Sequence, residues 1–444
     1  MTNKNFLFLT NVILVIFIFQ LSGQSNFAQP NKVVEQIREA AAFLQNGNLA
    51  EAEKILRQTV KIAPTNVDAH NLLGIVLDQK GDATNAEREY RQALKINPKA
   101  VSPLANLGVL FARTKRYEQA AQTLENVLKI KPGHPQATIN LGFVYTSLGR
   151  YQKAAAFLQS AKQFEPDSSD IFFNLGLALF RLNRFDEAFS AFSSATELKP
   201  DSSESFYFLG LIAAGKKQDE TALGYFEKAV ALRPTYAEAN FMIGEILRNN
   251  NRLVGAAEFY EKARVQNPSQ PVNHIRLGGI YLALGNLDEA LDIFTKAAGR
   301  FPNIPEIYYF LSITARGKGN FDLALTSLRK SLALKSDNPD ALALLGAILA
   351  DRNEIVEGEK LLRQAANLDK NHFNAHHDLG RLLVRNRRYQ EALPILQRAS
   401  SLKPENPDVH YQLFLTLSRL KRQPEADREF AVYKKLTDEN KNRK

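Results

Sequence analysis

Cysteine is absent from this chain of 444 residues, and so is tryptophan. Without cysteine the chain cannot form disulfide bonds, hold zinc through thiolates or use a cysteine nucleophile. The hydrophobic fraction is 45%, which is ordinary for globular proteins, so disorder throughout the chain is not expected. The sequence therefore predicts a folded protein whose stability comes from packing rather than from covalent links.

Catalytic motifs are missing as well. The sequence contains no glycine-rich phosphate loop, no nucleophile elbow and no metalloprotease motif. Neither a cofactor nor a small-molecule substrate is therefore expected, and we predict that the protein is not an enzyme.

The seven histidines do not indicate a catalytic or metal site. Four of them share one position in the repeat described below, which indicates packing: His70, His274, His376 and His410. The densest polar group is His372, His376 and His377 with Asp378. A metal site is not favoured there, because His372 is expected to lie in a turn.

The N-terminus has the features of an export signal. A lysine near the start precedes an apolar run from Phe6 to Phe19, and small residues such as Gly23 and Ala28 follow. This order is typical of a secretory signal, and the run is shorter than the roughly 20 residues of a membrane span. We expect residues 1–28 to be a signal peptide, with an uncleaved N-terminal anchor as the alternative. The protein would then be exported, either periplasmic or secreted, or else anchored in the inner membrane of a bacterial envelope.

The charge is basic, with a formal net value of +10 and an excess of basic residues after Phe373. A basic surface can attract anionic lipid, nucleic acid or acidic protein. The favoured interpretation is a solvated, mildly basic surface. Nucleic acid is not a favoured partner, because the groove surface described below lacks a basic stripe. Membrane contact is expected only through the N-terminal segment, if that segment stays attached.

The sequence repeats every 34 residues without an insertion, and three positions define the repeat. We number each repeat from a small residue at position 0. That column reads Ala40, Gly74, Gly108, Gly142, Gly176, Gly210, Gly244, Gly278, Ser312, Gly346, Gly380 and Phe414. Position +12 holds alanine in eleven repeats and Gly358 in the tenth. In the first eleven repeats position +24 holds proline, for example Pro64, Pro98 and Pro404, except at Ser336 and Lys370.

Each repeat is predicted to contain two helices, called helix A and helix B. In the second repeat, residues 67–79 should form helix A and residues 84–96 helix B, joined by a turn at 80–83. The pair Asn97–Pro98 then ends helix B, because the residue before proline disfavours helical geometry.

This pattern resembles the tetratricopeptide repeat family, whose period is 34 residues and whose motif places L-G, A, F and P in this order. The resemblance covers residues 33–440 as twelve tandem repeats and leaves a polar tail at 441–444. It implies an all-α fold, a right-handed α-solenoid (superhelix) of helix-turn-helix repeats. In such an array each repeat stacks on its neighbours.

The small residues explain why a glycine stands inside helix A, where it costs roughly 1 kcal/mol relative to alanine. We expect positions 0 and +12, such as Gly74 and Ala86, to face each other and let the two helices approach. Residues at −4, −1 and +3 should complete the contact with helix B, while those at −5 and +2 should meet the neighbouring repeat.

Positions −3 and +1 of helix A, here called the groove face, point away from the predicted contact with helix B. A solvated face should be polar there, but these columns are apolar and aromatic. The family resemblance places this face on the concave wall, so Phe173, Tyr207, Phe241 and Tyr309 become candidate ligand anchors. The alternative is that these side chains pack helix A against the next helix A. Arginines follow near the end of helix A, at Arg113, Arg181, Arg248, Arg316, Arg385 and Arg419, where they could bind carboxylates or simply complement the helix dipole.

Asparagine stands at position −2 in three consecutive repeats, at Asn106, Asn140 and Asn174. This row looks like the asparagine ladder of the repeat arm of O-linked N-acetylglucosamine transferase, which grips a peptide backbone. The row ends at Phe208, so it could support only a short clamp. The carboxylate-clamp pattern that binds chaperone tails in this family is absent.

The function predicted from these features is a non-enzymatic protein-interaction scaffold. It would bind an extended peptide or a partner helix in its concave groove, in envelope, pilus or secretion assembly. The alternative is a substrate-selecting subunit of a separately encoded glycosyltransferase. The candidate peptide-binding residues are Asn106, Asn140, Phe173, Asn174, Arg181, Tyr207, Phe241, Arg248, Tyr309 and Arg316.

Overall fold

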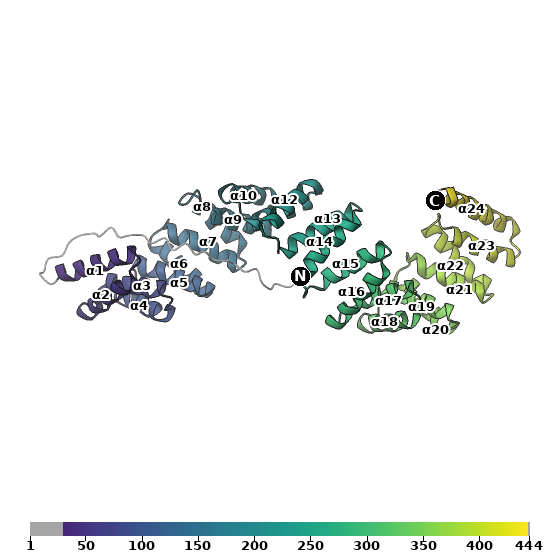
Figure 1. The fold of residues 1–444 in the computed structure, drawn as a ribbon, viewed down its shortest axis with the longest axis horizontal. Coiled ribbons are helices and arrows are strands. Elements are labelled where there is room, and N and C mark those ends of the chain that lie inside the picture. The colour runs from purple at the N-terminus through teal and green to yellow at the C-terminus, as the bar shows by residue number, and fades with distance from the viewer. Residues whose placement is uncertain (1–29, 443–444) are drawn as a thin grey trace. The chain divides into compact units, whose positions relative to one another are not determined.

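The computed structural model describes residues 30–442 (Figure 1). The predicted signal or anchor at residues 1–28 lies outside the described residues, as do the last two residues of the polar tail. Within the described part the chain is entirely helical and contains no strand, so the all-α class is confirmed. None of the described helices is both long and apolar enough to span a bilayer.

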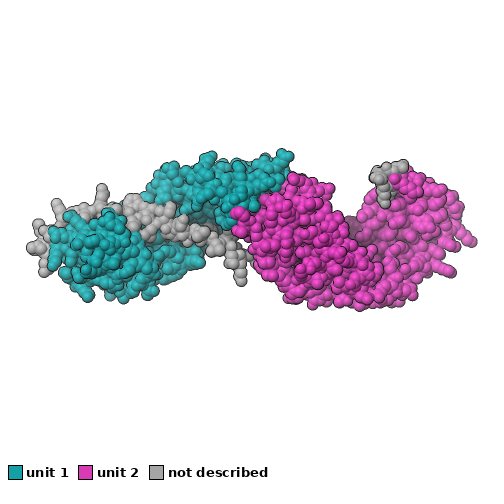
Figure 2. Space-filling view, viewed as in Figure 1, with its two compact units in different colours: residues 1–233 teal, residues 234–444 magenta. Residues whose placement is uncertain are grey.

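The chain divides into two compact units, unit 1 up to Arg233 and unit 2 from Pro234 (Figure 2). The helices of unit 1 are α1 (Pro30–Gln45), α2 (Leu49–Ile62), α3 (Val67–Gln79), α4 (Ala83–Ile96), α5 (Val101–Arg113), α6 (Tyr117–Ile130), α7 (Pro135–Ser147), α8 (Tyr151–Ala161), α9 (Ser169–Arg181), α10 (Phe185–Leu198), α11 (Ser203–Gly215) and α12 (Asp219–Leu232).

The helices of unit 2 continue the same alternation of helix A and helix B. They are α13 (Ala237–Asn249), α14 (Leu253–Gln266), α15 (Pro271–Ala283), α16 (Leu287–Arg300), α17 (Pro305–Gly317), α18 (Phe321–Leu334), α19 (Pro339–Asp351), α20 (Ile355–Leu368), α21 (Phe373–Arg385), α22 (Tyr389–Leu402), α23 (Pro407–Arg419) and α24 (Gln423–Asn442). The last helix B is six residues longer than its predecessor and continues past residue 440.

Asparagine caps and turn residues with positive φ define the ends of the helices. Asn66 caps α3 by accepting a hydrogen bond from the backbone N–H of Ala69 at 2.8 Å, and Asn338 and Asn406 cap α19 and α23 in the same way. The turn from helix A to helix B needs one residue with positive φ, which glycine supplies at Gly81. The same backbone geometry is adopted by Lys115, Lys217, Arg387 and Lys421.

The glycine at position 0 makes room for the large side chain at position +16 of helix B. A Cβ added to Gly74 would lie 2.5 Å from the ring of Tyr90, and one added to Gly210 would lie 2.6 Å from the ring of Phe226. Both rings stand at position +16 of helix B and are almost fully buried. The nearest neighbour of the glycine in these repeats is therefore the ring at +16, and the predicted contact between positions 0 and +12 stays a prediction for them.

Every glycine of this column has a +16 side chain among its nearest neighbours. The residues at +16 are Leu56, Tyr90, Leu124, Leu158, Phe192, Phe226, Tyr260, Phe294, Leu328, Leu362, Leu396 and Phe430. Two glycines do face each other in the tenth repeat, where a Cβ on Gly346 would lie 2.9 Å from the carbonyl oxygen of Gly358. The alanines at +12 are buried and fill the remaining space between the helices.

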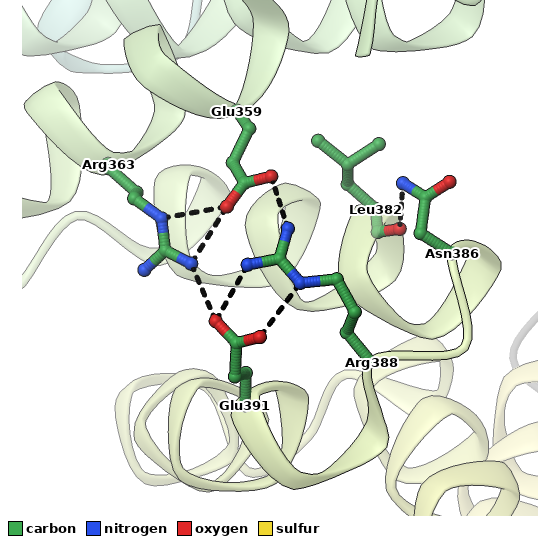
Figure 3. A network of polar contacts seen from close by, with 6 residues as sticks. All are labelled: Glu359, Arg363, Leu382, Asn386, Arg388 and Glu391. Atoms are coloured by element: carbon green, nitrogen blue, oxygen red, sulfur yellow. Dashed lines mark hydrogen bonds and ion pairs between the residues drawn. The ribbon is translucent and has the colours of Figure 1, made fainter. Parts of the chain in front are cut away.

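Ion pairs link the turn of one repeat to helix B of the repeat before it. Glu53 accepts from Lys80 at 2.5 Å, and Glu87 accepts from Arg116 at 2.5 Å. Figure 3 shows a network of this kind, in which Arg388 binds Glu359 of the preceding repeat at 2.6 Å and Glu391 of its own repeat at 2.7 Å. Such pairs are partly solvated, so each adds modestly to stability and is weakened by salt.

Candidate peptide-binding face

The groove face is closed at the start of unit 1 and opens toward its end. Ala105 and Ile139, at position −3 of the third and fourth repeats, are 1% and 8% exposed, so they belong to the core. Phe173 and Tyr207, at the same position of the next two repeats, are half-buried. The alternative reading, core packing, therefore holds for the aliphatic members of this column in unit 1, while the aromatic members keep a solvent-facing surface.

The two aromatic side chains also pack inside their own repeats, which the sequence did not lead us to expect. The ring of Phe173 lies edge-on to Phe192 of helix B, with centroids 5.7 Å apart. The ring of Tyr207 lies 5.7 Å from that of Phe226. The prediction that position −3 has no contact with helix B is therefore wrong. The ring at +16 lies over the glycine and reaches the side chain one turn earlier on helix A.

In unit 2 the same contact with helix B is made by Phe241, whereas Tyr309 contacts a ring on its own helix. Phe241 packs against Tyr260 with centroids 5.5 Å apart, and Tyr309 packs against its neighbour Phe310 at 5.5 Å. Both side chains are half-buried. Burial raises the pKa of Tyr309 to about 12, so its hydroxyl is protonated and can donate a hydrogen bond at neutral pH.

The three asparagines at position −2 differ in how their side chains are used. Asn106 donates to the side-chain oxygen of Asn71 in the preceding repeat at 3.0 Å. Asn140 and Asn174 each donate to a backbone carbonyl one turn earlier, at 2.8 Å and 2.9 Å. Asn140 is only 6% exposed, whereas Asn106 and Asn174 are partly exposed. Of the three, only Asn106 and Asn174 are therefore exposed enough to contact a ligand.

The arginines at the end of helix A form two groups. Arg113 forms an ion pair with the buried Asp78 of the previous repeat, and Arg385 pairs with Asp351. By contrast, the exposed guanidinium groups of Arg181 and Arg316 form no ion pair or hydrogen bond with another described residue. Arg181 and Arg316 therefore remain available for a carboxylate on a ligand.

Arg248 belongs to a charged cluster that sequence reasoning missed. Glu245, at position +1 of an otherwise apolar column, accepts from Arg248 at 3.0 Å, from Tyr260 at 2.6 Å and from Arg276 at 2.7 Å. Burial alone would raise the pKa of Glu245, but the hydrogen bonds from Tyr260 and Arg276 outweigh it, so the pKa is lowered. The cluster could have been recognised in the sequence from two residues: Glu245, an acid in the otherwise apolar +1 column, and Arg276, at position −2 of the next repeat.

The histidine column confirms its predicted packing role. In all four repeats the Nε2 atom of histidine lies 2.9 to 3.2 Å from the backbone carbonyl of the residue at position +24 of the preceding repeat: His70, His274, His376 and His410. His70 and His410 also meet a carboxylate through Nδ1, that of Glu89 at 2.7 Å and that of Glu429 at 2.6 Å.

The cluster at His372 makes separate local contacts. His372 lies 3.0 Å from Asp340, and His377 lies 3.3 Å from Asp378. The described residues contain no group of three or more potential ligands that could hold a metal ion.

Family models identify the repeats. Two models described as tetratricopeptide repeat match residues 37–101, 148–203, 173–237 and 209–271 in one case and residues 111–172 and 250–312 in the other. The chain is a tetratricopeptide repeat protein. A model described as bacterial transcriptional activator domain matches residues 314–440.

Solved structures of similar fold share little sequence with this tetratricopeptide repeat protein. YrrB, described as a TPR protein with an unusual peptide-binding site, is 23% identical, with 41% of this chain and 95% of that chain covered and a TM-score of 0.40. PilF of Pseudomonas aeruginosa is 22% identical, with 47% of this chain and 95% of that chain covered and a TM-score of 0.42. A chain of the Cut9 and Hcn1 assembly of the APC/C is 15% identical, with 93% of this chain and 94% of that chain covered and a TM-score of 0.46. No curated protein sequence matches the chain.

Proposed function

We propose that this protein-interaction scaffold binds an extended peptide or a partner helix on its groove face. The observation that carries the proposal is the half-exposed aromatic side chain at position −3, followed on the same helix by an unpaired arginine. In α9 these residues are Phe173 and Arg181. A purely structural packing position would not need its aromatic ring partly in water or a cation without a partner.

The spacing on α9 suggests what the ligand presents. Phe173 and Arg181 are eight residues apart, which corresponds to about 12 Å along the helix. An extended peptide covers that distance in about four residues. A peptide lying along α9 would therefore place an apolar side chain and a carboxylate about four residues apart. Asn174, half-buried between them, offers an amide that could contact the peptide backbone.

Unit 2 would use the same chemistry with a different set of side chains. In α17, Tyr309 supplies an aromatic ring with a protonated hydroxyl, and Arg316 supplies an unpaired guanidinium seven residues later. In α13, Phe241 stands seven residues before Arg248, which is already bound to Glu245. A ligand at α13 would therefore meet a charge-balanced surface, whereas α17 favours an acidic ligand.

The cellular setting remains a proposal that rests on the N-terminal sequence. The apolar run from Phe6 to Phe19 with its small-residue exit supports export, so the partners would be proteins of envelope, pilus or secretion assembly. The alternative role, as a substrate-selecting subunit of a glycosyltransferase, depends on the asparagine row. Asn140 is buried, so no structural observation favours that alternative.

A selection from random peptides tests this function. Phage-displayed 15-residue peptides would be selected on the full chain and measured by titration against Phe173→Ala, Tyr207→Ala and Arg181→Met. We expect selected peptides to lose at least tenfold in affinity with each variant. Tyr225→Ala is the matched control, because Tyr225 is a half-buried aromatic residue on helix B that packs against Phe189. Peptides that respond only to Tyr225→Ala would contradict the assignment to the groove face.

A further inference from the structure

One edge of unit 1 combines exposed lysine with exposed isoleucine. Where helix B ends in each of the first three repeats, the sequence reads Lys-Ile, at 61–62, 95–96 and 129–130. Ile62 is 59% exposed, Ile130 is 39% exposed and Ile96 is partly buried. Isoleucine is among the residues most often fully buried. These three pairs, here called the Lys-Ile edge, therefore present apolar side chains to the surroundings.

The lysines of this edge form no close ion pair within the described part of the chain, and Lys129 interacts at longer range with Glu125, one turn earlier on α6. Lys61, Lys95 and Lys129 are exposed and form no ion pair with a described residue, and Lys129 only contacts the side-chain oxygen of Asn126 at 3.3 Å. Residues 58–67, 92–101 and 126–135 contain no aspartate or glutamate, but they contain two further exposed lysines, Lys99 and Lys131.

The acidic residues next to the edge in sequence are Asp68, in the first turn of α3, and Glu125, one turn before Lys129 on α6. Asp68 is half-buried, and burial raises the pKa of its carboxyl group. These two carboxylates stand against the five lysines of the edge, which leaves an excess of positive charge there. The same edge in the fifth repeat is different, because Glu197 precedes the exposed Leu198 there. The basic character is a property of the first three repeats and not of the repeat pattern as such.

The three pairs lie on one edge because the repeats stack in register. Helix α2 packs against α3, α4 against α5, and α6 against α7, and the helices A also contact one another. Helix α1 begins at this same edge, since helix A starts where helix B ends. In the sequence, Pro30 follows the apolar run that ends at Phe19.

We propose that the Lys-Ile edge binds the surface of a lipid bilayer that contains anionic headgroups. Surfaces that lie on membranes combine apolar side chains, which enter the boundary between headgroups and acyl chains, with lysine or arginine, which attract anionic lipid. A nucleic acid would contact the lysines and leave the isoleucines in water, so the exposed Ile62 and Ile130 favour lipid. This contact extends the expected membrane contact beyond the N-terminal segment and is independent of the groove face.

Vesicle flotation of the full chain tests the electrostatic part of this proposal. Vesicles of phosphatidylcholine with 30% phosphatidylglycerol would be compared with vesicles of phosphatidylcholine alone. For Lys61→Ser/Lys95→Ser/Lys129→Ser we expect binding to the anionic vesicles to fall on the order of 100-fold, because each lysine near an anionic surface contributes about a factor of five. The N-terminal apolar run is present in every variant, and binding to the vesicles of phosphatidylcholine alone measures its contribution.

The matched control removes the same charge from unit 2. Lys330, Lys335 and Lys360 are exposed and form no ion pair with a described residue, so Lys330→Ser/Lys335→Ser/Lys360→Ser should bind as the native chain does. Equal loss in both triple variants would show a response to net charge alone and would overturn the assignment to this edge. Unchanged binding in the first variant would overturn it as well.

A tryptophan reporter tests the insertion of the isoleucines. The chain has no tryptophan, so Ile62→Trp creates a single probe. Leu368→Trp is the matched control, since Leu368 is 50% exposed at the same position of the tenth repeat. We expect brominated lipid in anionic vesicles to quench the fluorescence of Ile62→Trp and not that of Leu368→Trp. Quenching of both or neither would contradict the proposal, as would equally strong binding of a 20-base-pair DNA duplex that depends on the same lysines.

Discussion

Alanine substitution at two glycines of the sixth repeat separates packing from helix propensity. Gly210 lies in α11 beneath the ring of Phe226, and an added Cβ would come within 2.6 Å of that ring. Gly224 lies in α12, where an added Cβ meets no atom within 4 Å. Replacing either glycine by alanine should stabilise its helix by about 1 kcal/mol, because alanine has the higher helix propensity. Only Gly210→Ala incurs overpacking, at roughly 1–3 kcal/mol. The two variants should therefore differ by about 2 kcal/mol, with Gly224→Ala more stable than the native chain.

Hydrogen exchange of the amides in α11 and α12, read by mass spectrometry, measures this difference locally. A local reading is needed because long repeat arrays can unfold in parts, which makes a single free energy of unfolding poorly defined. Phe226→Ala provides the internal check, because the cost of Gly210→Ala should vanish once the ring is gone. If Gly210→Ala protected these amides as well as Gly224→Ala does, the ring at position +16 would not be what requires the glycine.

Three further predictions concern charged groups. Arg113→Met should destabilise unit 1 by about 2 kcal/mol in urea unfolding, because it leaves the buried carboxylate of Asp78 without its partner, whereas the matched change Arg181→Met should have no effect. The hydrogen bond from His70 to Glu89 outweighs burial and raises the pKa of His70 above its ordinary 6.5, so its stabilisation should be complete below pH 6.5 and be lost as pH rises through the folded-state pKa. Burial lowers the pKa of His274, so the stability that depends on His274 should rise with pH instead of falling. NMR titration of the imidazole signals measures both pKa values. Similar values for His70 and His274 would show that the reasoning is wrong. Glu359→Gln should lower the urea midpoint more at low salt than at 0.5 M NaCl, because its pairs with Arg363 and Arg388 are partly solvated, and a salt-independent shift would argue against an ionic origin.

The repeat and its helices could be predicted from the sequence because they depend on residues with strong local effects. Glycine at position 0 and proline at +24 recur in one register, and the helices begin and end close to where Asn66 and Asn97 indicate. The contact between the glycine and the side chain at +16 was not predicted from the sequence. The column at +16 varies between leucine, phenylalanine and tyrosine, so it is less conspicuous than a column of one residue type.

The position of the groove face could be predicted from the sequence. The solvent exposure and the ion pairs of its individual side chains could not. Phe173 and Ile139 occupy the same position, yet Ile139 is buried and Phe173 is only half-buried. Whether an arginine is available depends on an acid in the preceding repeat. Arg113 has Asp78 within reach, and Arg181 has no equivalent partner. Such contacts between repeats depend on how the helices stack.

The binding of a partner at the groove face is the central claim, and a photocrosslinker at residue 207 tests it most directly. Benzoylphenylalanine would replace Tyr207 in the chain expressed in its native host, and Tyr225 in a second variant as the control on helix B. Mass spectrometry would then identify the crosslinked product. The account predicts a defined protein partner at 207 that disappears with Phe173→Ala and is absent at 225. Crosslinks from 207 only to neighbouring helices of the same chain would contradict it and assign these aromatic residues to the core.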